Sequence, residues 1–224
     1  MKRSEINNHL KAAKDYLKKY CFELPPWAFW SPEDWAKTGN ECNEIREKML
    51  GWDLTDFGSG DFLKIGLLLF TIRNGSPDPG AAKNYAEKIM IAQPGQVTPI
   101  HFHWSKAEDI INRGGGRLVM KLWQATIDEK LSDMPVTVQV DGITKTFAAG
   151  ETVSFAPGES IALLPRTYHT FWAEDAPCVI GEVSRTNDDR TDNRFYKPAG
   201  RFPDIVEDEA PLHLLCTEYP TRKI

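Results

Sequence analysis

The chain has 224 residues, a formal net charge of −5 and a hydrophobic content of 41%, which is enough for a buried core. No basic patch stands out, so nucleic-acid binding is not expected, because phosphates call for clustered lysines and arginines. No apolar run approaches the roughly 20 residues that span a bilayer. The polar N-terminus shows no signal peptide. We expect a cytoplasmic protein with neither a membrane nor a nucleic acid as a partner.

Four cysteines are scattered along the chain without a CxxC pair, at Cys21, Cys42, Cys178 and Cys216. This spacing argues against structural zinc and against a redox dithiol. We expect free thiols in a reducing compartment.

Residues 1–50 are predicted to be helical. Apolar side chains in the first stretch recur with a period close to 3.6, as on one face of a helix. A second helix is predicted from Pro32 to near Met49, because Ser31 suits the N-cap and proline suits the first helical position. We expect both helices to pack against the rest of the chain rather than to carry chemistry.

Residues 51–185 are predicted to form a β-barrel or sandwich, because short apolar runs alternate there with Gly, Pro and Asp clusters. Asp141-Gly142 predicts a tight hairpin. No helices separate the runs, so a parallel βαβ fold is not expected. The expected strands are Phe62–Thr71, Ala86–Ile91, Arg117–Trp123, Val136–Val140, Lys145–Phe147, Ile161–Leu164, His169–Ala173 and Cys178–Val183.

Residues 186–224 are polar and contain prolines, and residues 187–192 are expected to form an exposed loop. The few apolar side chains of this tail need cover, so it is predicted to wrap the barrel or to reach a neighbouring subunit. The tail is too poor in apolar residues to form a core of its own. We therefore predict one domain over residues 1–224.

The strongest chemical signal is a pair of histidines with a glutamate close behind. His101 and His103 would point to the same side of a strand, because alternate side chains share a face. Glu108 follows after a short turn and can return to the same cavity from the next strand. Two imidazoles and a carboxylate suit a divalent transition ion.

The spacing around these residues resembles the first motif of the cupin family, G-x5-HxH-x3,4-E-x6-G. Gly95 lies six residues before His101, and Gly115 lies seven residues after Glu108. The resemblance implies a mainly β fold. We expect a single cupin barrel, that is, a double-stranded β-helix or jelly roll, with N-terminal helices and a wrapping C-terminal tail.

The second cupin motif, which should supply a third histidine, is degenerate here. The chain has five histidines, and His9 and His213 fall in the N-terminal helix and the tail, which leaves His169 as the fourth predicted ligand. Three imidazoles and one carboxylate leave open positions on a six-coordinate ion, as in catalytic sites. Mn²⁺ or Fe²⁺ suits this set, and Co²⁺ and Zn²⁺ are alternatives.

Four segments, residues 101–104, 108–116, 181–184 and 187–189, resemble the D-lyxose isomerase family, and the likeness extends to Arg201-Phe202-Pro203. The resemblance implies a manganese-dependent aldose–ketose isomerase that converts D-lyxose to D-xylulose, and commonly D-mannose to D-fructose. A homodimer is expected from the family and from the apolar residues of the tail.

Aldose–ketose exchange moves a proton between C1 and C2 through an enediol and requires a base. Glu182 is the first candidate. A two-residue turn at Asp175-Ala176 would set His169 opposite Glu182, inside the barrel. A slip of one residue would turn Glu182 to the surface instead.

Two lysines are the cationic candidates. Lys88 lies in an apolar strand, where it could bind a sugar hydroxyl or stabilise the enediolate, and Lys106 lies between metal ligands as a second catalytic candidate. Either could instead be a solvated surface residue. Glu108, Asp188 and Asp192 are further candidates for contact with the sugar, and a solvated loop is the alternative for the two aspartates.

Three other functions would use the same cupin scaffold. A dioxygenase or decarboxylase would share the four ligands. A phosphosugar isomerase would catalyse the same exchange but would need cationic groups converging on a phosphate. A sugar-binding or regulatory cupin would not catalyse at all, and the intact ligand set disfavours it.

Overall fold

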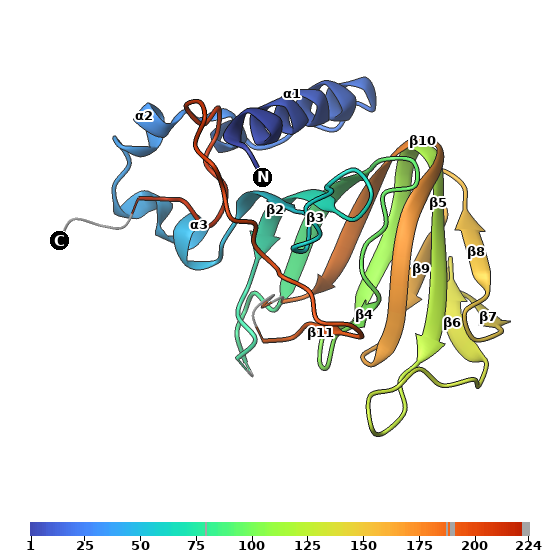
Figure 1. Ribbon diagram of the computed structural model, residues 1–224. Helices are drawn as coiled ribbons and strands as arrows, with labels where there is room; N and C mark the ends of the chain where they lie inside the picture. The colour runs from blue at the N-terminus through green and yellow to red at the C-terminus, as the bar shows by residue number, and fades with distance from the viewer. Residues whose placement is uncertain (79, 187, 189–190, 221–224) are drawn as a thin grey trace.

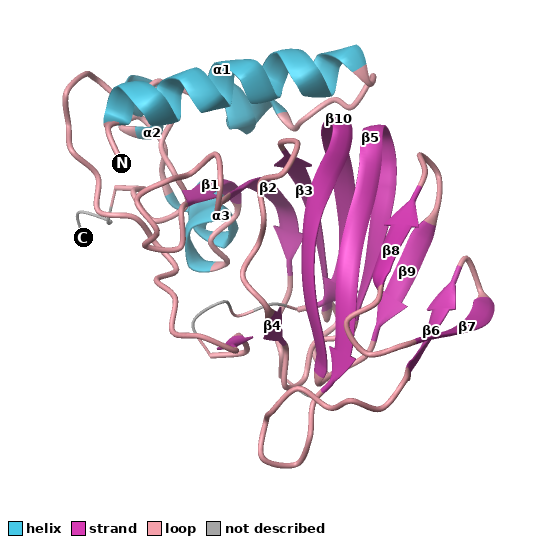
Figure 2. Ribbon diagram, turned by 45° about the vertical axis from the view of Figure 1, so that its right-hand side comes forward, coloured by secondary structure: helices cyan, strands magenta, loops and turns pink. Residues whose placement is uncertain are grey.

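The computed structural model describes residues 1–78, 80–186, 188 and 191–220. Eleven strands form one sheet that curls into a barrel, and the helices gather at one side of it (Figures 1 and 2). Each pair of neighbouring named strands is antiparallel, in the order β1-β2-β3-β10-β5-β9-β6-β7. The helices are α1 (Arg3–Lys19), η1 (Pro26–Phe29), α2 (Pro32–Trp35), η2 (Asn40–Cys42) and α3 (Asn43–Glu47). The strands are β1 (Gly51–Thr55), β2 (Leu67–Asn74), β3 (Tyr85–Ala92), β4 (His101–Phe102), β5 (Glu108–Gln124), β6 (Val136–Val140), β7 (Ile143–Phe147), β8 (Thr152–Phe155), β9 (Ser160–Leu163), β10 (Thr167–Arg185) and β11 (Arg194–Phe195).

Helix α1 covers the outer face of the sheet around β2 and β3 (Figure 2). Its buried apolar side chains pack with outward-facing residues of the strands in one hydrophobic cluster. The next residue along each strand points the other way, into the barrel. Thus Phe70 and Ile89 lie under the helix, whereas Leu69 and Met90 belong to the interior core. Because successive side chains of a strand point to opposite faces, the sheet separates two hydrophobic cores, one inside the barrel and one under α1.

The helix predicted from Pro32 to near Met49 is interrupted in the structure: α2 ends at Trp35, and helical structure resumes in η2 and α3, from Asn40 to Glu47. Its start is as expected, because the Ser31 side chain accepts a hydrogen bond from the backbone N–H of Asp34 at 3.2 Å. The α-helix ends at Trp35, where the carbonyl accepts a bond from the Thr38 hydroxyl at 2.8 Å. Side-chain bonds of this kind compete with the helical ladder. The glycine that follows has low helix propensity.

The Asp-Gly hairpin is confirmed. Asp141 and Gly142 have positive φ angles of 51° and 77°, and Val140 pairs with Ile143. A two-residue turn with two positive φ angles matches the right-handed twist of the strands on either side.

The second predicted hairpin, at Asp175-Ala176, is wrong. Strand β10 is continuous from Thr167 to Arg185 and runs antiparallel to β5, with a register shift between Glu174 and Cys178. Close backbone approach explains the difference, because a Cβ atom at Gly116 would collide with carbonyl oxygens of β10. The glycines of β5 thus accommodate a bulge where the sequence suggested a turn.

The two halves of β10 have different outer neighbours. In the first half His169 pairs with His101 of β4, and in the second half Glu182 pairs with Lys88 of β3. Strand β5 flanks both halves. One long strand therefore connects the predicted metal ligands to the predicted base.

The C-terminal tail wraps its own chain. Strand β11 pairs with β4, and the tail then returns to α1, as the orange and red trace in Figure 1 shows. There the Arg3 N–H donates to the Val206 carbonyl at 2.9 Å, and the Arg3 guanidinium pairs with Glu207 at 2.6 Å. Residues 187, 189 and 190 of the expected loop lie outside the described residues. Within the described chain, no helix is long and apolar enough to cross a membrane.

Candidate metal centre

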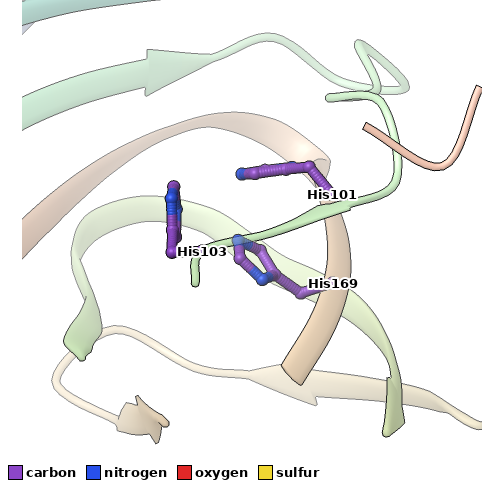
Figure 3. Close-up of side chains that lie close together, drawn as sticks. All are labelled: His101, His103 and His169. Carbon is purple, nitrogen blue, oxygen red and sulfur yellow. The ribbon is translucent and has the colours of Figure 1, made fainter. Parts of the chain in front are cut away.

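Three histidines meet inside the barrel (Figure 3). His101 lies on β4, His103 directly follows that strand, and His169 lies on β10. One ligand nitrogen from each lies within 4.8 Å of the other two. The pairing of β4 with β10 explains the arrangement, because it sets His101 directly opposite His169.

Each imidazole is oriented by a backbone carbonyl. A carbonyl can only accept a hydrogen bond, so each Nδ1 carries the proton and each Nε2 keeps its lone pair for a metal. The acceptors are Pro99 for His101 at 2.8 Å, Asp192 for His103 at 2.9 Å and Thr167 for His169 at 3.1 Å.

Glu108 completes the predicted ligand set at the start of β5. Its Oε1 atom lies 3.4 Å from Nε2 of His103 and 3.3 Å from Nε2 of His169. That oxygen is buried and has no hydrogen-bond partner among the described residues. An unsatisfied buried carboxylate oxygen is costly, and a divalent cation shared with the imidazoles would satisfy it. The four residues therefore fit a metal ion.

The protonation states also suit a metal. Burial and the neighbouring imidazoles hold the pKa of His101 well below its usual range. Burial lowers the pKa of His169 to about 4, although Glu108 opposes the shift. For Glu108, burial raises the pKa, but the charge of Lys106, together with the interactions with His103 and His169, outweighs it and keeps the pKa well below normal. Neutral imidazoles and an ionised carboxylate are the forms that bind metals.

Glu182 lies beside this site, buried with 4% exposure. Its Oε1 atom is 3.0 Å from Nζ of Lys106 and 3.2 Å from Nζ of Lys88, and it accepts a bond from the Ser184 hydroxyl at 2.9 Å. Burial would raise the Glu182 pKa, but the two ammonium groups outweigh it and lower the pKa. Lys106 also contacts Glu108 Oε2 at 2.7 Å and so links the metal site to Glu182.

The surface alternatives for these three residues do not hold in this fold, because Lys88 and Lys106 are also buried, with 5% and 3% exposure. The interior position expected for Glu182 is found, although the hairpin used to predict it is absent. Glu182 faces inward because it shares the interior face of β10 with Ile180 and lies opposite Lys88.

The cavity around the metal site is lined by both charged and apolar side chains. The apolar lining includes Leu69, Met90 and Phe171, and the C-terminal tail adds Asn193, Phe195 and Arg201. Sequence reasoning did not single out Arg201 as a cavity residue. The only signal was the family resemblance of its segment.

Arg201 is bound by Asp53, an acidic residue that the sequence analysis did not predict as part of the site. Its guanidinium donates to the carboxylate of Asp53 on β1 at 2.5 Å and lies 4.8 Å from the ring centre of Phe202. An alternating pattern of buried and exposed residues could not have pointed to Asp53, because all five residues of β1 are buried.

The two aspartates predicted to contact the sugar lie elsewhere. Asp188 lines an adjoining cavity, which it shares with Lys88, and does not line the metal cavity. Asp192 is buried behind the metal site, where its carboxylate accepts bonds from the backbone N–H groups of Ser105 and Lys106.

The model of the D-lyxose isomerase family matches residues 1–219. The chain belongs to this family. It is 48% identical over 223 residues to the D-lyxose/D-mannose isomerase of Serratia proteamaculans, and 46% identical over 223 residues to that of Escherichia coli O157:H7; each alignment covers 98% of both proteins. The family resemblance of the sequence is thus confirmed, together with the enzyme class that it implies, an aldose–ketose isomerase.

Solved structures support the predicted fold. The L-ribose isomerase of Acinetobacter sp. DL28, in complex with L-ribose, gives a TM-score of 0.63 at 15% identity, with 92% of this chain and 98% of that chain covered. The L-ribose isomerase of Cellulomonas parahominis with L-ribose gives 0.57 at 17% identity, with the same coverage. The mainly β cupin barrel with N-terminal helices is confirmed.

Proposed function

We propose that the chain interconverts D-lyxose and D-xylulose, and D-mannose and D-fructose, at a Mn²⁺ ion held by His101, His103, Glu108 and His169. The observation that carries the proposal is the buried Glu182, an ionised carboxylate that Lys106 links to the proposed ligand Glu108. The names of two relatives at 46–48% identity, D-lyxose/D-mannose isomerases, support the choice of sugars.

Glu182 is the proposed base. Its low pKa keeps it ionised at neutral pH, so it can take the proton from C2 of the aldose and return it to C1. A bound divalent ion would polarise the carbonyl and the adjacent hydroxyl and stabilise the charge that develops as the proton leaves.

We propose different substrate contacts for the two lysines. The Lys106 ammonium group lies 2.7 Å from Glu108 and 3.0 Å from Glu182, and it could donate a hydrogen bond to an enediolate oxygen. Lys88 approaches Glu182 from β3 and can bind a sugar hydroxyl. The apolar side chains that line the cavity would limit the access of water to the reacting carbons.

The charges of the cavity favour a free sugar over a phosphosugar. Lys88 pairs with Glu182, Lys106 with Glu108 and Glu182, and Arg201 with Asp53. Each cationic side chain that lines the cavity in the described chain thus has a carboxylate within 3.2 Å. A phosphate group is usually bound by cationic groups available for charge-assisted bonds, and here these groups are already paired.

The test is to incubate the metal-free protein with Mn²⁺, Fe²⁺, Co²⁺ or Zn²⁺ and then with D-lyxose, D-mannose or their phosphates, and to assay ketose. We expect D-xylulose and D-fructose from the free sugars, with Mn²⁺ giving the highest rate. Ketose from the phosphates alone would overturn the choice of free sugars. No ketose from any substrate, or oxygen consumption with Fe²⁺, would overturn the isomerase itself.

We also propose a homodimer, because the wrapped tail leaves Phe202 and Val206 with exposed fractions of 38% and 59%. Light scattering on the eluted protein should give twice the mass of the chain. The mass of a single chain at micromolar concentration would contradict it.

A further inference from the structure

The three metal-site histidines are not oriented in the same way. His101 and His169 each donate from Nδ1 to the carbonyl of the residue two positions earlier. The acceptor for His103 is instead the carbonyl of Asp192, 89 residues further along the chain. The orientation of one predicted ligand therefore depends on the C-terminal tail.

The side chain of Asp192 holds the residues that follow His103. Its Oδ1 atom accepts bonds from the backbone N–H and the hydroxyl of Ser105, both at 2.9 Å. Its Oδ2 atom accepts the backbone N–H of Lys106 at 3.0 Å. Asp192 is only 8% exposed, so these bonds are shielded from water. Backbone N–H groups that lose their partners in such a place are costly.

This segment carries the cation that links the two acidic groups of the site. From a backbone fixed by Asp192, the side chain of Lys106 reaches both Glu108 and Glu182. A shift of the backbone would move Nζ relative to both carboxylates. Small displacements of groups at a reacting centre have large effects on rate.

We propose that Asp192 is a positioning residue, which orients His103 through its carbonyl and fixes Lys106 through its carboxylate. This role replaces the sugar contact expected from the sequence, and it rests on the metal site proposed above. Asp192 thereby couples the folding of the tail to the geometry of the metal ligand and of the bridging lysine.

The chain contains a matched control at the β6–β7 hairpin. Oδ1 of Asp141 accepts bonds from the backbone N–H and the hydroxyl of Ser160, both at 2.8 Å, which repeats the bonding of Asp192 to Ser105. Asp141 does not line the metal cavity. The two aspartates thus make the same pair of bonds to a serine, but Asp141 is exposed and lies away from the metal site, whereas Asp192 is buried and also binds Lys106.

The test compares Asp192→Asn with Asp141→Asn. An asparagine amide group cannot accept at both ends, so Asp192→Asn loses the bond to Ser105 or the bond to Lys106. We expect the Mn²⁺ affinity of the metal-free protein, measured by competition with a chelating dye, to fall about 10- to 100-fold. For D-lyxose, kcat should fall roughly 10- to 100-fold with KM nearly unchanged. Asp141→Asn should change none of these values.

A second measurement does not depend on activity or on bound metal. Amide hydrogen exchange in a peptide covering residues 101–108 should become faster in metal-free Asp192→Asn and stay unchanged in Asp141→Asn. If Asp192→Asn does not fold, Ser105→Ala removes one of the same bonds and should show smaller changes in the same direction.

The outcomes separate the possible roles of Asp192. A lower melting temperature with unchanged Mn²⁺ affinity, kcat and local exchange would overturn the proposal and leave a purely structural role. A raised KM with unchanged kcat and affinity would overturn it in favour of a sugar contact. If the wild-type protein forms no ketose but Asp192→Asn still weakens Mn²⁺ binding, the positioning role stands and the isomerase proposal fails.

Discussion

The two faces of the sheet around β2, β3 and β10 differ sharply. The outer face packs apolar side chains such as Phe70, Ile89 and Val179 under α1. The inner face, one residue along the same strands, carries Lys88 and Glu182 into the metal cavity. Removing apolar surface from water stabilises the fold by roughly 25 cal/mol per Å², whereas burying charges costs stability unless they are paired.

The comparison indicates how one strand serves stability and chemistry at once. Strand alternation lets the outer face pack under α1, while the inner face combines an apolar core with charged groups that packing alone would not select. Each inner charge has a partner of opposite sign, at 3.2 Å for Lys88 and at 3.0 Å for Lys106. Substitutions of the charged inner-face residues should therefore change activity, and those of the apolar outer-face residues should change stability.

The largest effect is expected for His101→Ala on the inner side. Loss of one imidazole should remove both bound metal and ketose formation, because the remaining ligands no longer enclose the ion. Metal analysis of the purified protein and an assay with D-lyxose measure the two losses. His9→Ala, a histidine of α1 outside the metal cavity, is the control and should retain metal and activity. Full activity in His101→Ala would exclude the proposed centre.

Phe70→Ala tests the outer face. Phe70 is fully buried, and its ring centre lies 5.0 Å from that of Trp52. The cavity should lower the free energy of unfolding by about 3–5 kcal/mol, as measured by urea titration. Activity per folded molecule should stay close to that of the wild-type protein. A loss of kcat without a loss of stability would show that the two faces are not separable.

Lys88→Met gives a smaller, pH-dependent effect. Lys88 and Lys106 together outweigh the burial of Glu182 and lower its pKa, so removal of Lys88 should raise that pKa. A base acts only when deprotonated. The acidic limb of the pH profile of kcat/KM should therefore move to higher pH. The control is Lys121→Met, because Lys121 lies on β5 and does not line the metal cavity. An acidic limb at the wild-type position would contradict the role of Lys88.

The smallest effect concerns Cys178, an inward-facing residue of β10. Cys178 is fully buried, and burial raises the pKa of its thiol to about 12. Cys21 is exposed. At pH 8, iodoacetamide should modify Cys21 in the native protein and reach Cys178 only after unfolding, because the thiolate is the reactive form. Mass spectrometry of digested samples gives the order. Rapid labelling of native Cys178 would show that this part of the barrel opens.

The grouping of the proposed metal ligands was predictable because the signal was local. His101, His103 and Glu108 lie within eight residues, and strand alternation with a following turn is enough to bring them together. His169 could be selected because few histidines remained. The fold followed from the same motif and from the pattern of short strands.

The remaining parts of the site depend on contacts between distant segments. The register of Glu182 depends on a bulge that the glycines of β5 allow, and a local turn rule gave the right face for the wrong reason. Arg201 enters the cavity only because the tail wraps back to Asp53. The bonds of Asp192 to residues nearly 90 positions away have no sequence pattern.

The most direct test of the central claim is the turnover and metal content of Glu182→Gln. Glutamine keeps the shape of the side chain but cannot accept the proton from C2. We predict that the variant binds as much Mn²⁺ as the wild-type protein, and that its kcat with D-lyxose falls by about 10²- to 10⁴-fold. Wild-type turnover in a fully metal-loaded variant would contradict the account and remove Glu182 from the mechanism.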